Sequence, residues 1–306
     1  MTLTYAEEVM FSNMFRAIPA LKLATGTTVA ATVLVAAHAC ADPARSLAPG
    51  AVSRSVGVAA EGTYYGATVP VGPGIARTYV KVENGAPVEL GIEMNEGALA
   101  GRPTDGAHDG HNNMEHRAED MFELPLPAEA GVTAYKSVNL GWMPFGHPGP
   151  FYSRPHFDFH FYVIPTAERL AIDPADPQWA QKASALPAPE FWPARYSPLH
   201  LLVPGSTAPG VTVPQMGLHW LDIASPELNG AEFTHTFFYG SWNGAIIFDE
   251  PMITKALLES KATVDVDLPP AAKYSTTGLR AHGYRVYFDE ATQRHRVALV
   301  KLAAPE

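Results

Sequence analysis

The fold class follows from the segment Arg77-Thr-Tyr-Val-Lys-Val-Glu-Asn84-Gly85-Ala-Pro-Val-Glu-Leu-Gly-Ile-Glu-Met94. Polar and apolar side chains alternate on both sides of Asn84-Gly85, which is the pattern of strands that bury one face. Asparagine followed by glycine tolerates the positive φ angles of a two-residue turn, so the segment predicts a β-hairpin. Antiparallel sheet is therefore the first expectation for the folded part of the chain.

Two more hairpins are predicted towards the carboxyl terminus. One turns at 241–244, between strands at 233–239 and 246–248, and the other turns at 289–292. The helices that we expect are few and short, and they cover Thr166–Ile172, a segment capped by Asp176 that ends near Ala183, and Ile253–Ser260. The prediction is a mainly β fold, either a sandwich or a distorted barrel with a few short helices.

Composition and charge limit the class of protein. Of the 306 residues, 47% are hydrophobic and only 17% are charged, which argues against disorder over most of the chain. The net charge of -10 argues against nucleic acid as a partner, because that partner selects clustered lysine and arginine. A single cysteine excludes a disulfide framework and a cysteine-based zinc finger.

The amino-terminal residues predict export. Residues 23–41 carry no charge and follow Arg16 and Lys22, and Ala37-His38-Ala39 suits a signal peptidase. Cys40 comes directly after this triplet, which resembles the cleavage box of a bacterial lipoprotein. A transmembrane anchor is the alternative, but the run is rich in threonine, glycine and alanine and poor in leucine and isoleucine.

This segment sets the expected organisation and location of the chain. We expect an export signal over 1–40, a flexible linker over 41–62 and a single β-rich domain over 63–306. The protein should lie outside the cytoplasm, as a secreted, periplasmic or lipid-anchored protein. A lipid on Cys40 is the one membrane attachment that we expect.

The residues most suited to chemistry lie on one predicted strand, Pro155–Val163. Since successive side chains of a strand point to opposite faces, one face carries phenyl rings and the other carries ligand-capable groups. The ligand-capable face consists of His156, Asp158, His160 and Tyr162. Such a row on an otherwise apolar strand favours a metal site. Hydrogen-bonded histidines that line a polar pocket or an oligomer interface are the alternative.

Spacing limits which of these groups can share one ion. Positions two apart on a strand lie about 6.6 Å apart and positions four apart about 13 Å, whereas a zinc–nitrogen bond measures about 2.0–2.1 Å. His156 and His160 therefore do not reach one ion from a flat strand, although a bulge would bring all three groups together. Alternatively, one histidine binds the ion while Asp158 orients an imidazole.

Further ligands must come from elsewhere in the chain. His219 is the best supplier, Glu250 at the end of a predicted strand is the outside candidate, and His147 lies in a loop that could approach His156. The predicted metal ligands are His156, Asp158, His160, His219 and Glu250. Zinc is the first expectation, iron and manganese also suit these ligands, and Met143, Met216 and Met252 would suit copper. The histidines of 108–116 are expected to form a solvated loop.

Several of these motifs together resemble a known family. They are Gly146-His147-Pro148, Pro155-His-Phe-Asp-Phe-His-Phe-Tyr162, Met216-Gly-x-His219-Trp-x-Asp222, the Phe237-x-Tyr-Gly240 turn and Glu250-Pro-Met-Ile-Thr254, in this order. This pattern is similar to that of an uncharacterised bacterial family of exported proteins and lipoproteins, a domain of unknown function with Thermus-type members. The resemblance covers about 64–260 and implies a β-rich fold and a homo-oligomer. It implies no catalytic residue.

Two functions therefore remain open. The first is an exported β-rich domain that binds a divalent metal ion through the histidine-bearing strand face. The second is a non-catalytic oligomer of the cell envelope that binds a small molecule or acts in a stress response. Metal content distinguishes the two.

Overall fold

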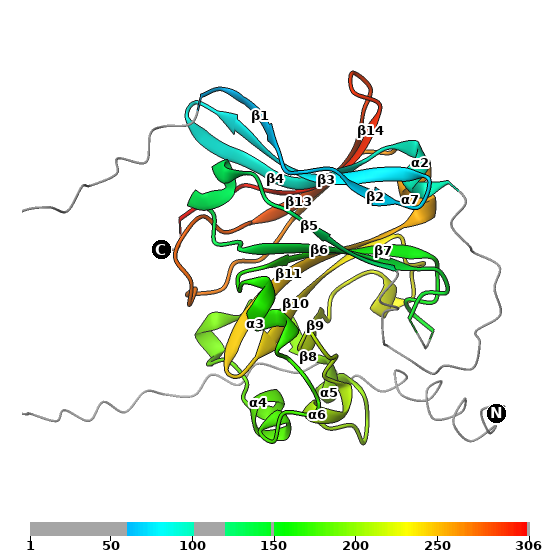
Figure 1. Cartoon of the computed structure of the whole chain (residues 1–306). Helices are drawn as coiled ribbons and strands as arrows, with labels where there is room; N and C mark the ends of the chain where they lie inside the picture. Colours follow the sequence, from blue (N-terminus) through cyan, green and yellow to red (C-terminus); the bar gives the residue numbers. More distant parts are fainter. Residues whose placement is uncertain (1–59, 101–119, 148–149, 305–306) are drawn as a thin grey trace, which may run out of the picture.

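The computed structural model describes residues 60–100, 120–147 and 150–304 (Figure 1). The predicted export signal, most of the predicted linker and the histidines of 108–116 lie outside the described residues. Among the helices that the described ranges contain, none has the length and apolar character needed to cross a membrane.

The described residues form two antiparallel sheets of seven strands each (Figure 1). Sheet A consists of β1 (Gly62–Tyr65), β2 (Val69–Val71), β3 (Gly74–Glu83), β4 (Ala86–Met94), β12 (Val264–Asp267), β13 (Gly283–Asp289) and β14 (Arg294–Val300). Sheet B consists of β5 (Met121–Leu124), β6 (Ser137–Met143), β7 (His156–Tyr162), β8 (Tyr196–Pro198), β9 (Leu218–Asp222), β10 (His235–Trp242) and β11 (Ala245–Thr254). The strand order is β1-β3-β4-β14-β13-β12 in sheet A, with β2 on β3, and β5-β6-β7-β11-β10-β9-β8 in sheet B.

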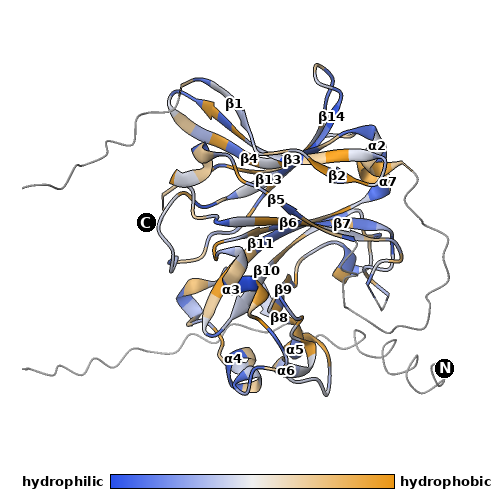
Figure 2. Ribbon diagram, in the orientation of Figure 1, coloured by the Kyte–Doolittle hydropathy of each residue, from blue (hydrophilic) through white to orange (hydrophobic). Residues whose placement is uncertain are grey.

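The two sheets pack face to face and share one apolar core. Val80, Leu90 and Ile92 of sheet A belong to the same buried cluster as Trp142 and Phe159 of sheet B. Hydrophobic and hydrophilic residues are interleaved along the strands, because each strand presents one face to this core (Figure 2). Both sheets remain open, so the prediction of a mainly β fold is confirmed as a sandwich rather than a distorted barrel.

The three predicted hairpins are present. Asn84 and Gly85 have φ angles of 51° and 74° between β3 and β4, as a tight turn with two positive φ angles requires. Asn243 and Gly244 repeat this geometry between β10 and β11, with φ angles of 49° and 82°. β11 is longer than predicted, since it continues beyond Phe248 to Thr254.

Short helices decorate the sandwich, and two of them begin later than predicted. The α-helices are α2 (Glu96–Leu99), α3 (Thr166–Leu170), α4 (Trp179–Ser184), α5 (Leu199–Leu202), α6 (Ala208–Val211) and α7 (Lys255–Glu259). The 3-10 turns are η2 (Ala128–Val132), η3 (Pro189–Phe191) and η4 (Glu227–Asn229). Asp176 accepts the N–H of Gln178 at 2.8 Å in a turn that precedes α4, rather than capping the helix itself. Helix α7 starts after Thr254, whose hydroxyl accepts the N–H of Leu257 at 3.2 Å.

The outer face of sheet B, which points away from sheet A, is covered rather than exposed. Helices α3 to α6 lie on this side of the molecule (Figure 1). One small apolar cluster there joins Phe248 and Tyr162 to Ile172, which follows α3. A second joins Phe238 to Tyr152 and Phe233 from the covering loops. Side chains on the outer face of β7 are therefore buried, although they lie outside the central core.

Candidate metal centre

Strand β7 divides its side chains between the two faces as the alternation predicts. Phe157, Phe159 and Phe161 enter the core between the sheets. The rings of His156 and His160 contact the outer clusters instead, with centroids 5.4 Å from Phe233 and 5.1 Å from Phe248, respectively. All seven residues of β7 are buried. The ligand-capable groups thus lie in a covered layer between sheet B and its loops.

One group of possible ligands joins three strands, and we call His160, His219 and Glu250 the His160 group. The Nε2 atom of His160 lies 3.4 Å from Oε1 of Glu250, and the Nε2 atom of His219 lies 3.6 Å from Oε2. The pairing of β7 with β11 runs through Asp249–Phe161 and resumes in the same register at Met252–Asp158, so Glu250 lies opposite His160. Two imidazoles therefore converge on the two oxygens of one carboxylate.

His219 and Glu250 lie on strands that β10 separates, and Gly240 of β10 leaves room between them for the ring of Phe248. Gly240 pairs with His219 on one side and with Phe248 on the other. A Cβ atom at this position would lie 1.8 Å from the ring of Phe248. That ring occupies the space above the glycine, and its centroid lies 5.2 Å from the ring of His219.

The carboxylate of this group is in an unfavourable environment for a negative charge. The side chain of Glu250 is 1% exposed. Burial raises the pKa of Glu250 well above its usual range, and the negative charge of Asp158 raises this pKa further. A charged Glu250 therefore requires a compensating positive charge close to its oxygens.

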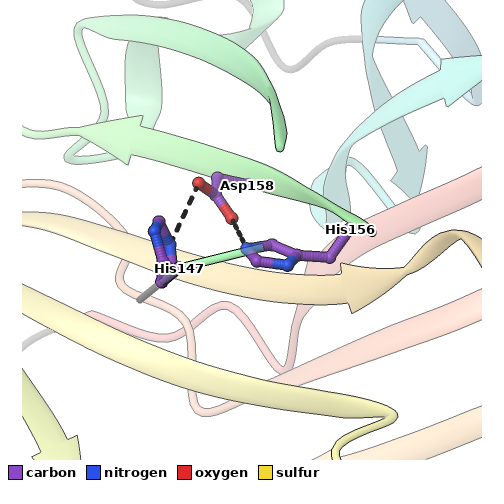
Figure 3. A group of neighbouring side chains, drawn as sticks. All are labelled: His147, His156 and Asp158. Carbon is purple, nitrogen blue, oxygen red and sulfur yellow. Dashed lines mark ion pairs between the residues drawn. The ribbon is translucent and has the colours of Figure 1, made fainter. Parts of the chain in front are cut away.

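A second group lies beside the first, and we call His147, His156 and Asp158 the His156 group (Figure 3). The Nε2 atom of His156 lies 3.1 Å from Oδ1 of Asp158, and the Nε2 atom of His147 lies 3.7 Å from Oδ2. The two imidazole centroids are 4.8 Å apart. His156 Nδ1 lies 2.6 Å from the carbonyl oxygen of Arg154 and donates to it, since a carbonyl only accepts.

The loop before β7 brings His147 to this group. Gly146 has a φ angle of 68°, and a Cβ atom there would lie 2.2 Å from the carbonyl oxygen of Tyr152. The N–H of His147 donates to that same oxygen at 2.8 Å. The loop thus turns back on itself at a position that only glycine fits.

Both groups match the spacing of metal ligands. Within each group, one ligand atom from every residue lies within 4.8 Å of the others. Two donor atoms that each lie about 2.1 Å from one tetrahedral zinc ion are separated by roughly 3.4 Å. The observed contacts of 3.1 to 3.7 Å surround this value. Small rotations of the side chains would place either set around one ion.

The structure distributes the five predicted ligands over the two groups. His156 and His160, which lie four positions apart, belong to different groups, in agreement with the spacing argument. The sequence predicts Glu250 at a strand end, but this is wrong, because β11 continues past Glu250 to Thr254. His147 is not among the five predicted metal ligands. Gly146, which precedes it, was the sequence feature that could have indicated a turn bringing His147 towards β7. Asp222, near His219, instead accepts from Arg195 at 3.1 Å.

Comparison with known proteins covers only part of the chain. Residues 82–142 match the TTHB210-like family, described as "Hypothetical protein TTHB210". This match supports an uncharacterised Thermus-type domain, and it ends before His147 and both groups. The chain matches no curated protein and no solved structure. The comparisons therefore assign no role to the candidate ligands.

Proposed function

We propose that this protein is an exported β-sandwich that binds a divalent metal ion, with zinc as the first choice, through the His160 group. One observation carries the proposal: both oxygens of the buried Glu250 carboxylate face the Nε2 atom of a different histidine, at 3.4 and 3.6 Å. Imidazole and carboxylate together suit zinc, iron and manganese. Because three strands of one sheet hold the ligands, their positions are fixed before an ion binds.

The neighbouring carboxylate on β11 supports the need for a cation. Asp249 points to the opposite face and is also buried, and it accepts a hydrogen bond from Arg280 Nη2 at 2.8 Å. Tyr135 donates to its other oxygen. The ion-pair contacts of Glu250, by contrast, are to imidazole nitrogens. A metal ion would compensate Glu250 as the guanidinium compensates Asp249.

The group has the composition of zinc sites that keep a position for a further ligand. Zinc held by two histidines and a glutamate supplies a Lewis acid with one position left open. His219 is the member nearest solvent, with a side chain that is 12% exposed, whereas His160 is fully buried. An ion or a small molecule would therefore enter past His219.

Export and homo-oligomer formation are also part of the proposal, and both are based on the sequence rather than on the metal site. Export rests on the uncharged run 23–41 and on Cys40, and a homo-oligomer rests on the family resemblance. Mass spectrometry of the protein recovered from the cell envelope is expected to show a chain without the predicted signal. A full-length chain that begins at Met1 would contradict export with cleavage.

Glu250→Gln and His219→Gln are expected to lose the bound ion. Glutamine keeps the volume of Glu250 but removes the charge that attracts the metal ion. Elemental analysis would be made on protein purified without an affinity tag. The reference protein and all its variants would carry glutamine in place of His108, His111 and His116, because these histidines could bind metal ions themselves.

His295→Gln is the matched control for these two variants. His295 is a buried histidine beside a carboxylate, 3.2 Å from Glu96, but it belongs to sheet A. This variant is expected to keep the full metal content. Metal content that is equal in the control and in Glu250→Gln would contradict the proposal. Metal-free protein whose melting is unchanged by a chelator would instead favour the small-molecule-binding oligomer.

A further inference from the structure

The His156 group has the same composition as the His160 group and lies on the same covered face. Each group contains two histidines and one carboxylate, and Figure 3 shows those of the His156 group. Asp158 and His160 are two positions apart on β7, which separates the two groups by about 6.6 Å along the strand. Repetition of one ligand set within one layer is an independent reason to expect metal chemistry there.

The orientation of His156 points its ligand atom at the carboxylate. When Nδ1 donates its proton to the carbonyl oxygen of Arg154, the neutral ring presents a lone pair on Nε2. That lone pair faces Oδ1 of Asp158 at 3.1 Å, and both side chains are fully buried. Two lone pairs at this distance repel each other unless a proton or a metal ion lies between them. Histidines that bind metals are oriented by this kind of hydrogen bond to a carbonyl.

The two carboxylates also lie close enough for their charges to interact. Asp158 and Glu250 are both buried on the outer face of sheet B. The ion-pair contacts of Asp158 include His147 and His156, and those of Glu250 are His160 and His219. An ion in the His160 group would contact the oxygens of Glu250 but not those of Asp158. A second cation in the His156 group would contact the buried oxygens of Asp158 directly.

We propose that His147, His156 and Asp158 bind a second divalent metal ion, which exchanges more readily than the ion of the His160 group. This inference rests on the proposed function, from which it takes both the ion in the His160 group and the choice of zinc. The two metal ions should differ in their rate of exchange because their ligands lie on different kinds of structure. Strands carry all three members of the His160 group. His147 lies on a loop, and its side chain is 19% exposed.

The test is the stoichiometry and release of zinc from the full chain. The protein is the tag-free form with glutamine at positions 108, 111 and 116, saturated with zinc and then freed of excess metal. Two zinc ions per chain are expected, and a chromogenic chelator is expected to remove them in a fast phase and a slow phase of equal amplitude. His147→Gln should remove the fast phase and one ion, whereas Glu250→Gln should remove the slow phase and the other.

Gly146→Ala provides a second variant that leaves every ligand unchanged. Its Cβ atom would collide with the carbonyl oxygen of Tyr152, so the loop must move and displace His147. Loss of the fast phase in this variant, with unchanged circular dichroism, is the expected result. Both variants alter a half-buried loop, and the wild-type stoichiometry tests the inference even where a variant folds poorly.

The possible outcomes separate this inference from the proposed function. One zinc ion that is lost in Glu250→Gln but kept in His147→Gln would overturn the second site and leave the first standing. One ion lost in both variants would show a single shared ion and would also overturn the inference. Two ions released at the same rate would overturn the difference in exchange. Zinc that is lost only in His147→Gln would overturn the proposed function, and no bound zinc would overturn both.

Discussion

Replacement of Arg280 by methionine is expected to lower the free energy of unfolding by about 3–5 kcal/mol, because it leaves a buried carboxylate without its cation. The guanidinium donates to Asp249 Oδ1 at 2.8 Å, and the two side chains are 4% and 2% exposed. Methionine fills a similar volume, so lost charge compensation rather than a cavity dominates the effect. Unfolding in urea, followed by circular dichroism, measures the change.

An exposed ion pair provides the control for this prediction. Lys301 pairs with Asp267 on edge strand β12, and these side chains are 58% and 79% exposed. Lys301→Met is expected to cost no more than about 1 kcal/mol, since water already solvates both charges. The double variant Arg280→Met, Asp249→Asn should recover part of the loss, because it removes the uncompensated charge as well. A small effect of Arg280→Met alone would contradict the buried pair.

Gly240→Ala is expected to destabilise the protein by about 3 kcal/mol and to abolish metal binding by the His160 group. The new methyl group would lie 1.8 Å from the ring of Phe248, and that ring has little room to move. Its centroid lies 5.3 Å from the ring of Tyr162, 5.1 Å from His160 and 5.2 Å from His219. Displacement of Phe248 therefore displaces both imidazoles.

Gly131→Ala is the matched control, because the Cβ atom that it adds meets no atom within 4 Å apart from its own neighbours along the chain. This variant should keep its metal and unfold at nearly the wild-type concentration of urea. Zinc analysis and urea unfolding on the two alanine variants test both parts of the prediction. Retention of both zinc ions by a well-folded Gly240→Ala protein would show that Phe248 does not position the histidines.

Local patterns explain which parts of the fold could be predicted. The hairpins at Asn84-Gly85 and Asn243-Gly244 depend on turn residues and on a period of two, and both are properties of neighbouring residues. The length of β11 could not be predicted in this way. Pro251 lies inside it, opposite Phe237, although proline is disfavoured within central strands because it lacks an N–H donor.

The part of the candidate site that depends on local sequence could be predicted, and the part that depends on strand order could not. Alternation along β7 placed His156, Asp158 and His160 on one face, and their spacing separated the two histidines. The meeting of His219 with Glu250 depends on the order β11-β10-β9 and on the absence of a side chain at Gly240. Pairing between strands distant in sequence decides this order, and no local pattern encodes it.

The central claim is that Glu250 and two histidines hold a metal ion on the covered face of sheet B. Anomalous diffraction at the zinc absorption edge, from crystals of tag-free protein, tests this claim most directly. A peak is expected about 2.0–2.2 Å from the Nε2 atoms of His160 and His219 and from an oxygen of Glu250. Zinc-saturated crystals with no peak among these three side chains would contradict the claim.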